Sequence, residues 1–232
     1  MSQYDKFAKE YITIRINMFD KNMNAEFPVM LQLLGDIQSQ KLLDLGCGFG
    51  DYAKVYSEKG AIVVAVDNSK KEIEHAQKLD MLNAKFMVYD ISKEFPFEEL
   101  SFDVITSSLV FDHLKDLKFI FKECNRVLKN NGIIVFSITN PVFYQERSVV
   151  GKINILGKKI IFGDYFKRRK IVRKWGGIAT MEHYHKPLED YFSAFLENGF
   201  ELLNFREPQS KTKKVTWHCK NPTFLVFKLK KR

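Results

Sequence analysis

Cysteine is scarce in this chain of 232 residues, which has 3 thiols, at Cys47, Cys124 and Cys219. An odd number without the paired spacing of zinc ligands excludes a disulfide framework and a cysteine-rich metal centre. No apolar run reaches the length of a membrane span, and the first residues, MSQYDKFAKEY, lack the apolar core of a secretory signal. We therefore expect reduced thiols, no membrane partner and a cytoplasmic location.

The composition is that of a globular protein. Hydrophobic residues make up 45% of the chain, and 21 residues are Phe, which excludes a disordered polypeptide. A chain of this length buries a substantial core, so we expect one domain over residues 1–232.

Positive charge is unevenly distributed along the sequence. The formal net charge is +9, but residues 1–150 carry −3 and residues 151–232 carry +12. A basic surface in the last third would attract nucleic acid or an anionic small molecule. A lysine-rich face that meets only solvent is the alternative.

The most informative stretch is residues 41–50, KLLDLGCGFG. Its leucines predict a buried parallel strand, and the three glycines after them predict a turn with almost no side chains. Residues 51–60 begin with Asp51 and end with Gly60, which is typical of a helix. A strand, a bare turn and a helix N-terminus form a site where a ligand can touch the main chain.

A further acid follows the next predicted strand, residues 61–66. This acid, Asp67, can accept hydrogen bonds from the two hydroxyls of a ribose. The glycines run G-x-G-x-G, not the G-x-G-x-x-G of dinucleotide sites, and Asp44 and Asp51 lie beside them. Two acids would repel a pyrophosphate but suit a ligand with an ammonium group. The pattern predicts a pocket for such an adenosine-bearing ligand; a glycine-rich turn in another kind of α/β protein is the alternative.

These motifs resemble those of the class I S-adenosylmethionine-dependent methyltransferases. LLDLGCGFG resembles the family's motif I, Asp67 its ribose-binding acid, Tyr89-Asp90-Ile91 its adenine-side motif, and residues 107–114 its motif IV. The resemblance spans most of the chain and implies S-adenosyl-L-methionine as cofactor, with S-adenosyl-L-homocysteine as product. The cofactor-binding residues that we expect are Tyr11, Asp44, Gly46, Cys47, Gly48, Asp67, Asn68, Asp90, Ile91 and Ser107.

The resemblance implies a Rossmann-like α/β fold with a seven-stranded, mostly parallel sheet in the order 3-2-1-4-5-7-6 and helices on both faces. Alternating strand and helix patterns in residues 40–139, the predicted cofactor-binding core, favour this arrangement. We expect a helical cap over residues 1–39, a lid over 140–187, and a helix with a strand pair over 188–232. The later elements that we expect are helices at 70–79, 116–128 and 188–198 and strands at 85–89, 102–107, 133–139, 200–206 and 223–229.

The cap and the lid carry weaker signals. Tyr4-Asp5-x-Phe7-Ala8-x-x-Tyr11 resembles the cap of small-molecule methyltransferases, in which aromatic residues close over the methionine end of the cofactor; anchoring of an amphipathic helix is the alternative. In the lid, residues 153–162 and 165–175 predict short strands around Gly157 and Gly163.

Methyl transfer from a sulfonium is an in-line displacement, which requires alignment and exclusion of water. It needs a base only when the acceptor must lose a proton early. The candidate bases are His113 and His185, and a structural role is the alternative for His113. Tyr184-His185-Lys186-Pro187 resembles the Tyr-His-Arg-Pro signature of a bacterial small-molecule subfamily, with lysine in place of arginine. The acceptor-binding residues that we expect are Phe143, Tyr165, Trp175, His183, Tyr184 and His185. For the four aromatic residues among them, ordinary packing within the lid is the alternative.

Two other motifs are rejected. We expect no metal site, because no acid or cysteine cluster accompanies His183 and His185 in the sequence. Asn140-Pro141-Val142-Phe143 is similar to the N-P-P-Y/F motif of methyltransferases that act on adenine. It follows the fifth strand instead of the fourth and lacks the second proline, so it predicts a turn that begins the lid.

Three functions remain open at this point. The first is methyl transfer to an O, N or C atom of a small, aromatic or apolar acceptor, by a monomer or homodimer. The second is RNA methylation, favoured by Lys167-Arg168-Arg169-Lys170 with Arg173 and Lys174. The third is a regulator that binds the cofactor without catalysis.

Overall fold

The computed structural model describes residues 5, 22–79, 81–144, 151–155, 158–162, 164–175, 179–209 and 221–232. Within these ranges, the side chains of 22–23, 143–144, 151–162 and 173–179 are not described. Several predictions therefore lie outside the described residues or side chains, namely those for the aromatic pattern from Tyr4 to Tyr11, Phe143, Gly157, Gly163, Arg173, Lys174 and Trp175.

A seven-stranded sheet forms the centre of the molecule, in the order β3-β2-β1-β4-β5-β11-β10. Strands β1 to β5 are parallel, whereas β11 is antiparallel to both β5 and β10. The expected order 3-2-1-4-5-7-6 is confirmed once the four strands outside this sheet, β6 to β9, are left out of the numbering. The sheet strands are β1 (Lys41–Leu45), β2 (Ile62–Asp67), β3 (Ala84–Val88), β4 (Phe102–Ser108), β5 (Leu128–Thr139), β10 (Phe200–Arg206) and β11 (Phe224–Lys231).

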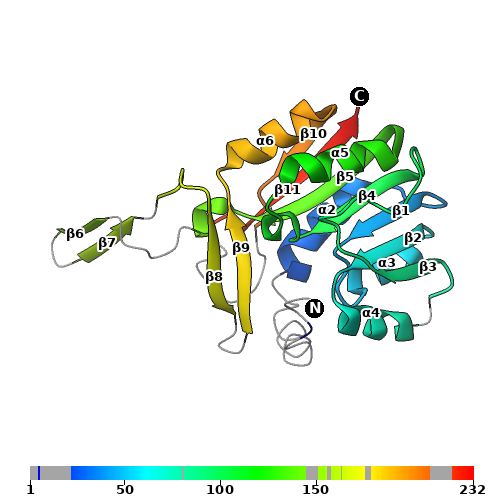
Figure 1. The fold of residues 1–232 in the computed structure, drawn as a ribbon, viewed down its shortest axis with the longest axis horizontal. Helices are drawn as coiled ribbons and strands as arrows, with labels where there is room; N and C mark the ends of the chain where they lie inside the picture. Colours follow the sequence, from blue (N-terminus) through cyan, green and yellow to red (C-terminus); the bar gives the residue numbers. More distant parts are fainter. Residues whose placement is uncertain are drawn as a thin grey trace.

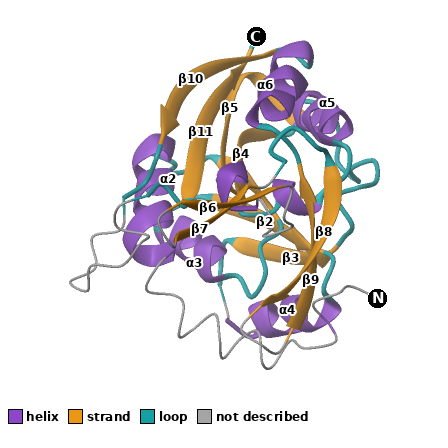
Figure 2. Cartoon of the chain, turned by 90° about the vertical axis from the view of Figure 1, so that its left-hand side faces the viewer, coloured by secondary structure: helices purple, strands orange, loops and turns teal. Residues whose placement is uncertain are grey.

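Helices cover both faces of the sheet, as expected (Figure 2). The π-helix η2 (Asn22–Glu26) leads into α2 (Phe27–Leu34), which shares one apolar core with α3 (Asp51–Glu58) and α4 (Lys70–Ala76). The second core, on the opposite face, contains buried residues of α5 (Leu117–Val127) and α6 (Leu188–Glu197). A short 3-10 helix, η3 (Gln77–Leu79), continues α4.

Side-chain caps explain where two of these helices begin. The Ser69 hydroxyl accepts a hydrogen bond from the Glu72 amide at 3.3 Å, which fits the serine-to-glutamate spacing of a capping box. Asp116 caps α5 in the same way, accepting from the Phe119 amide at 3.0 Å. Each cap satisfies a backbone amide of the first turn, which fixes where α4 and α5 begin.

The beginning of β5 differs from the prediction. We expected a helix to Leu128 and a strand from residue 133, but β5 already starts at Leu128. Its pairing with β4 shifts register between these points, and Asn131 has a φ of 62°. The predicted turn is thus an irregular segment inside the strand. Gly132 is required there, because a Cβ would lie 2.9 Å from the Asp103 carbonyl oxygen.

Residues 140–187 form two hairpins beyond the sheet. One pairs β6 (Gly151–Ile155) with β7 (Lys158–Phe162), and the other pairs β8 (Arg169–Trp175) with β9 (Ala179–His185). A 3-10 helix, η5 (Pro141–Tyr144), confirms the predicted turn that precedes them. The β8–β9 hairpin stands beside the sheet (Figure 1) and contacts η4 (Phe111–His113), the 3-10 helix that follows β4.

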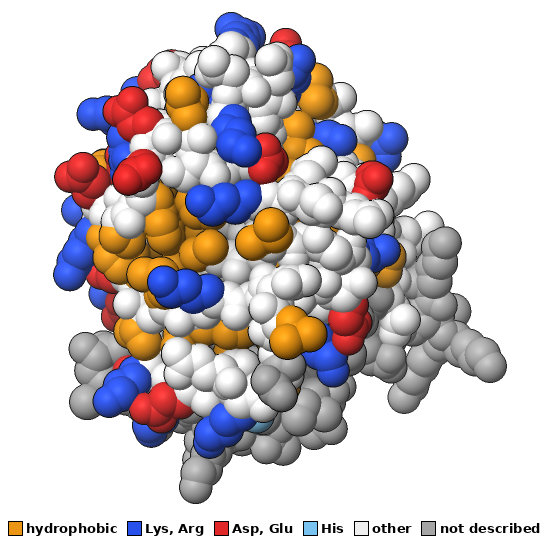
Figure 3. Space-filling model, turned by 90° about the vertical axis from the view of Figure 1, so that its right-hand side faces the viewer, with side chains coloured by type: hydrophobic (Ala, Val, Ile, Leu, Met, Phe, Trp, Pro, Cys, Tyr) orange, Lys and Arg blue, Asp and Glu red, His pale blue; other side chains and the backbone are white. Residues whose placement is uncertain are grey.

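The other end of the molecule has a different surface. Figure 3 shows exposed hydrophobic side chains among charged residues there, and the exposed Ile62, Leu82 and Leu100 all lie at or just before the start of a strand. The hairpins are at the opposite side of the molecule. No helix within the described ranges is long and apolar enough to cross a membrane.

Candidate active site

The glycine-rich loop follows β1 and turns the chain sharply. Gly46, Gly48 and Gly50 have φ values of 77°, 54° and 85°, which favour glycine. The Gly46 amide donates to the Val66 carbonyl at 2.8 Å, which ties the loop to β2. A Cβ on Gly46 would lie 2.3 Å from the Val110 side chain, so glycine also allows the loop to pack against the segment after β4.

Asp67 ends β2 and fixes the loop from the other side. Its Oδ2 accepts from the Gly48 amide at 3.0 Å, and its Oδ1 accepts from the Ser69 amide at 2.8 Å. Burial is the largest influence on the carboxyl and raises its pKa. Each carboxylate oxygen can accept more than one hydrogen bond. The carboxylate is therefore held in place and retains the capacity to accept from ribose hydroxyls.

Asp44 lies in β1 beneath the loop and is 3% exposed. Its Oδ1 accepts from the Thr106 hydroxyl at 3.1 Å, whereas its Oδ2 has no hydrogen-bond partner among the described residues. Burial, with smaller effects from Asp67 and Glu26, raises the pKa of Asp44 to about 7. A buried oxygen without a donor fits the ammonium group of a methionine-derived ligand, because that group would supply both the hydrogen bond and the opposite charge.

The other residues that we expect to bind the cofactor differ in burial and in their hydrogen bonds. Asn68 is exposed directly after β2, and Ile91 is buried after β3. Asp90 accepts from the Ser92 amide and hydroxyl through Oδ1. Ser107 donates its hydroxyl to the Leu45 carbonyl at 2.9 Å, so this contact joins β4 to β1. Tyr11 lies outside the described residues.

Two histidines and an acid meet where η4 contacts β9. The rings of His113 and His183 are 4.2 Å apart between centroids, and His183 Nδ1 lies 3.9 Å from Asp112 Oδ2. His113 Nδ1 is 2.8 Å from the Glu182 carbonyl oxygen. The fold brings these distant segments together, so that an acid and a second histidine lie beside His183.

The remaining residues of the Tyr-His-Lys-Pro segment make structural contacts at the base of the hairpin. His185 is 2% exposed, and its Nε2 lies 2.8 Å from the Tyr165 carbonyl oxygen. The Tyr165 hydroxyl accepts from the Leu188 amide at 2.8 Å. These contacts hold the chain as it enters α6, whereas His113 lies within the segment that resembles motif IV. A base role for His185 stays a prediction.

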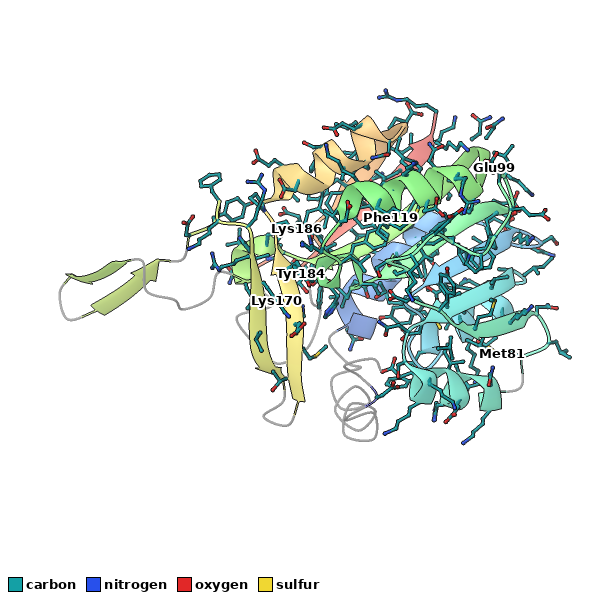
Figure 4. All side chains as sticks on the ribbon, in the orientation of Figure 1. Met81, Glu99, Phe119, Lys170, Tyr184 and Lys186 are labelled. Atoms are coloured by element: carbon teal, nitrogen blue, oxygen red, sulfur yellow. The ribbon has the colours of Figure 1, made fainter. Side chains whose placement is uncertain are left out.

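Lys186 is buried beside Tyr184, between the hairpin and the main sheet (Figure 4). Its ammonium donates to the carbonyl oxygens of Leu114 and Tyr184 and lies 5.5 Å from the centre of the Tyr184 ring. Burial lowers its pKa to about 8. The Lys186 ammonium therefore interacts with these carbonyl oxygens as a compact single charge. The Tyr-His-Arg-Pro signature that this segment resembles has arginine at the same position.

Glu26 is an important residue that the sequence prediction missed. It is the last residue of η2, is 0% exposed, and accepts hydrogen bonds from the hydroxyls of Tyr52, Ser108 and Ser137 at 3.0, 2.9 and 2.5 Å. Ser108 ends β4, where the motif IV segment begins. Glu26 thus connects the N-terminal helices to the edge of the sheet at which the site lies.

Cofactor affinity is expected to rise with pH from 5.5 to about 7 and to level off above it. Because the carboxyl of Asp44 has a pKa of about 7 without ligand, a cationic ligand must displace a proton at lower pH. The loss approaches about tenfold per pH unit well below the pKa. Calorimetric titration with S-adenosyl-L-homocysteine measures this dependence, and Asp44→Asn should reduce the slope. A slope of the same size in Asp44→Asn would contradict the assignment.

Comparison with known proteins identifies the core of the chain. The model of a family described as "Methyltransferase domain" matches residues 43–136, which run from the middle of β1 through β4 and into β5. An S-adenosylmethionine-dependent methyltransferase from Mesorhizobium loti has the same fold, with a TM-score of 0.77, 22% identity, and coverage of 89% of this chain and 97% of that one.

Three proteins with similar sequences were also found, two of which are named as methyltransferases. An uncharacterized protein of Haemophilus influenzae is 36% identical over 231 residues, covering 94% of this chain and 90% of that protein. The ubiquinone biosynthesis O-methyltransferase of Pelagibacter ubique is 34% identical over 55% of this chain and 53% of its own length. The demethylmenaquinone methyltransferase of Thermotoga maritima is 32% identical over 58% and 59%, respectively. This chain therefore spans only a little over half the length of these two named relatives.

The residues that the family model matches include the glycine-rich loop, Asp44 and Asp67. S-adenosyl-L-methionine is the cofactor of this family, and the Asp44 oxygen that has no hydrogen-bond partner among the described residues is consistent with its ammonium group. The chain belongs to the class I S-adenosylmethionine-dependent methyltransferases.

Proposed function

We propose that this enzyme transfers a methyl group from S-adenosyl-L-methionine to an O, N or C atom of a small acceptor. The main support is the polar cluster of Asp112, His113 and His183, which forms where η4 contacts β9. Asp112 and His183 are buried, and a largely buried polar cluster suits a small molecule better than a polymer. The two named relatives are, by their names, an O-methyltransferase of ubiquinone biosynthesis and a demethylmenaquinone methyltransferase.

Different residues of this chain would bind different parts of the cofactor. Asp67 accepts from the ribose, Asp44 meets the ammonium group, and Asp90 with Ile91 holds the adenine. The bound cofactor supplies a methyl group on a sulfonium, which needs alignment and a dry site more than acid–base help. Residues 140–187 form the lid that excludes water, in a domain that extends over residues 1–232.

His113 is the candidate residue on the acceptor side. The Glu182 carbonyl can only accept a hydrogen bond, so the contact at 2.8 Å requires that His113 Nδ1 carry the proton. In the neutral imidazole, Nε2 then has the lone pair that a base or a ligand atom needs.

The RNA alternative has less support in the arrangement of the basic segment, residues 167–174. Arg168 Nη2 lies 2.5 Å from Asp190 Oδ1, and Lys170 Nζ lies 2.7 Å from Glu182 Oε2. These charges have partners within the chain, which reduces what they offer to phosphates.

A methyl-transfer assay tests the proposal. The purified enzyme is incubated with tritiated S-adenosyl-L-methionine and a fractionated cell lysate, with and without nuclease. We expect label in the small-molecule fraction, insensitive to nuclease, and at least tenfold less label with Asp67→Ala. Label that nuclease releases would instead support RNA methylation. Saturable cofactor binding without transfer to any fraction would support the regulator and overturn the proposal.

A further inference from the structure

Asp112, His113 and His183 have the composition of a metal site. Each offers one ligand atom, and these atoms all lie within 4.8 Å of one another. Asp112 is 2% exposed and His183 is 8% exposed, so the cluster is not a chance gathering of surface side chains. Two imidazoles and one carboxylate are ligands that Zn²⁺ prefers, and Fe²⁺ and Mn²⁺ accept them too.

The distances are close to those of a bound ion. Ligands about 2.0–2.1 Å from a tetrahedral zinc ion lie roughly 3.3–3.4 Å from one another. Asp112 Oδ2 and His183 Nδ1 are already 3.9 Å apart. Side-chain rotations that draw the three ligand atoms together by roughly 1 Å would therefore complete the site, without movement of the backbone.

His113 makes a hydrogen bond of the kind that orients a metal-binding histidine. A histidine that binds metal through one ring nitrogen usually donates the other N–H to a carbonyl or a carboxylate. His113 does this through Nδ1, 2.8 Å from the carbonyl oxygen of Glu182. Glu182 immediately precedes His183 in β9, so the same strand orients one candidate ligand and supplies another.

Lys186 is the nearby positive charge that would oppose a cation. Its ammonium is directed toward the carbonyl oxygens of Leu114 and Tyr184, both of which accept hydrogen bonds from it. An ion held by the cluster would therefore not have to displace Lys186 from these two contacts.

We propose that Asp112, His113 and His183 bind one divalent transition-metal ion, for which Zn²⁺ is the probe. Three protein ligands leave a coordination position open, as in catalytic zinc sites. Beside the segment that resembles motif IV, a bound cation would lower the pKa of a hydroxyl group that occupied this position. This last consequence rests on the proposed function, and it selects acceptors that carry a hydroxyl group.

Zinc titration of the metal-free full chain tests the site. After dialysis against a chelator, calorimetry with ZnCl₂ should show one ion bound per chain with a Kd in the micromolar range or below. His183→Asn, His113→Asn and Asp112→Asn should each weaken binding at least tenfold. His75→Asn, which changes an exposed histidine on α4, and Cys47→Ser, which removes a partly exposed thiol, should leave the Kd unchanged. Circular dichroism must show that each variant is folded.

The absorption of bound Co²⁺ gives a second, independent measurement. Ligand-field bands of a tetrahedral ion are expected in the unaltered chain and in His75→Asn, and their loss is expected in His183→Asn. No zinc binding, or equal binding by His183→Asn and the unaltered chain, would overturn the proposal. Methyl transfer that survives chelation in a chain that binds no zinc would overturn the metal site and leave the proposed function intact.

Discussion

Gly46→Ala is expected to lower the free energy of unfolding by about 2–5 kcal/mol and to abolish measurable cofactor binding. The left-handed backbone costs an L-residue about 1–2 kcal/mol, and overpacking costs typically about 1–3 kcal/mol more. The new Cβ would lie 2.3 Å from Val110 Cγ2 and 3.1 Å from Val110 Cβ. Because the valine side chain is stiff, the loop and the segment after β4 must separate.

Two further variants separate the cost of the backbone conformation from the steric clash with Val110. Gly35 has a similar φ of 74°, and a Cβ there would meet nothing within 4 Å. Gly35→Ala therefore reports the cost of the backbone alone and should leave cofactor affinity unchanged. The double variant Gly46→Ala with Val110→Ala should recover part of the lost stability, as a positive coupling in a double-mutant cycle. Urea unfolding and calorimetry measure both quantities, and equal losses in Gly35→Ala and Gly46→Ala would refute the steric explanation.

Glu26→Ala is expected to destabilise the protein by about 3–5 kcal/mol, because it removes the acceptor of a buried hydrogen-bond network. The substitution leaves the hydroxyls of Tyr52, Ser108 and Ser137 without their shared acceptor. Each stranded buried hydroxyl costs about 1–3 kcal/mol, and relaxation of the neighbours recovers part of that sum.

The matched controls are Glu26→Gln and Glu74→Ala. Glu26→Gln keeps one oxygen acceptor and should lose less stability than Glu26→Ala. Glu74 is an exposed residue of α4 whose ion pair with Lys70 is 3.8 Å long, and Glu74→Ala should change the free energy of unfolding by less than about 0.5 kcal/mol. A loss below about 1 kcal/mol in Glu26→Ala, measured by urea unfolding, would show that the network contributes little.

The parts of the fold that the sequence predicts are those in which neighbours along the chain determine the structure. Strand β1, its glycine loop and α3 are recognisable because apolar runs, glycines and helix ends follow one another directly. The start of β5 is not, because the pairing of Leu128 with Phe102 across the sheet overrides the local preference of Asn131 and Gly132 for a turn. The strand order itself came from the family resemblance, since no local pattern specifies which strands pair.

The residues of the candidate site also fall into two groups, those that local spacing in the sequence predicts and those that only tertiary contacts bring together. Asp44 and Asp67 follow from their spacing around the glycines, within one strand–turn–helix–strand unit. The grouping of Asp112 with His183 depends on how the β8–β9 hairpin packs against η4, a tertiary contact without a local signal. Glu26 was missed for the same reason, because its three hydroxyl partners come from separate elements.

The position of β11 determines when the sheet can be completed during synthesis. This strand lies between β5 and β10, and β10 pairs with no other strand of the sheet. Since β11 is the last of these strands to leave the ribosome, β10 has no partner until then and the β5 edge stays open. In the folded protein, Phe136 of β5 stacks on Phe227 of β11, with 4.7 Å between the ring centroids. A nascent chain that lacks β11 would expose this aromatic surface, and chaperones would be expected to bind it.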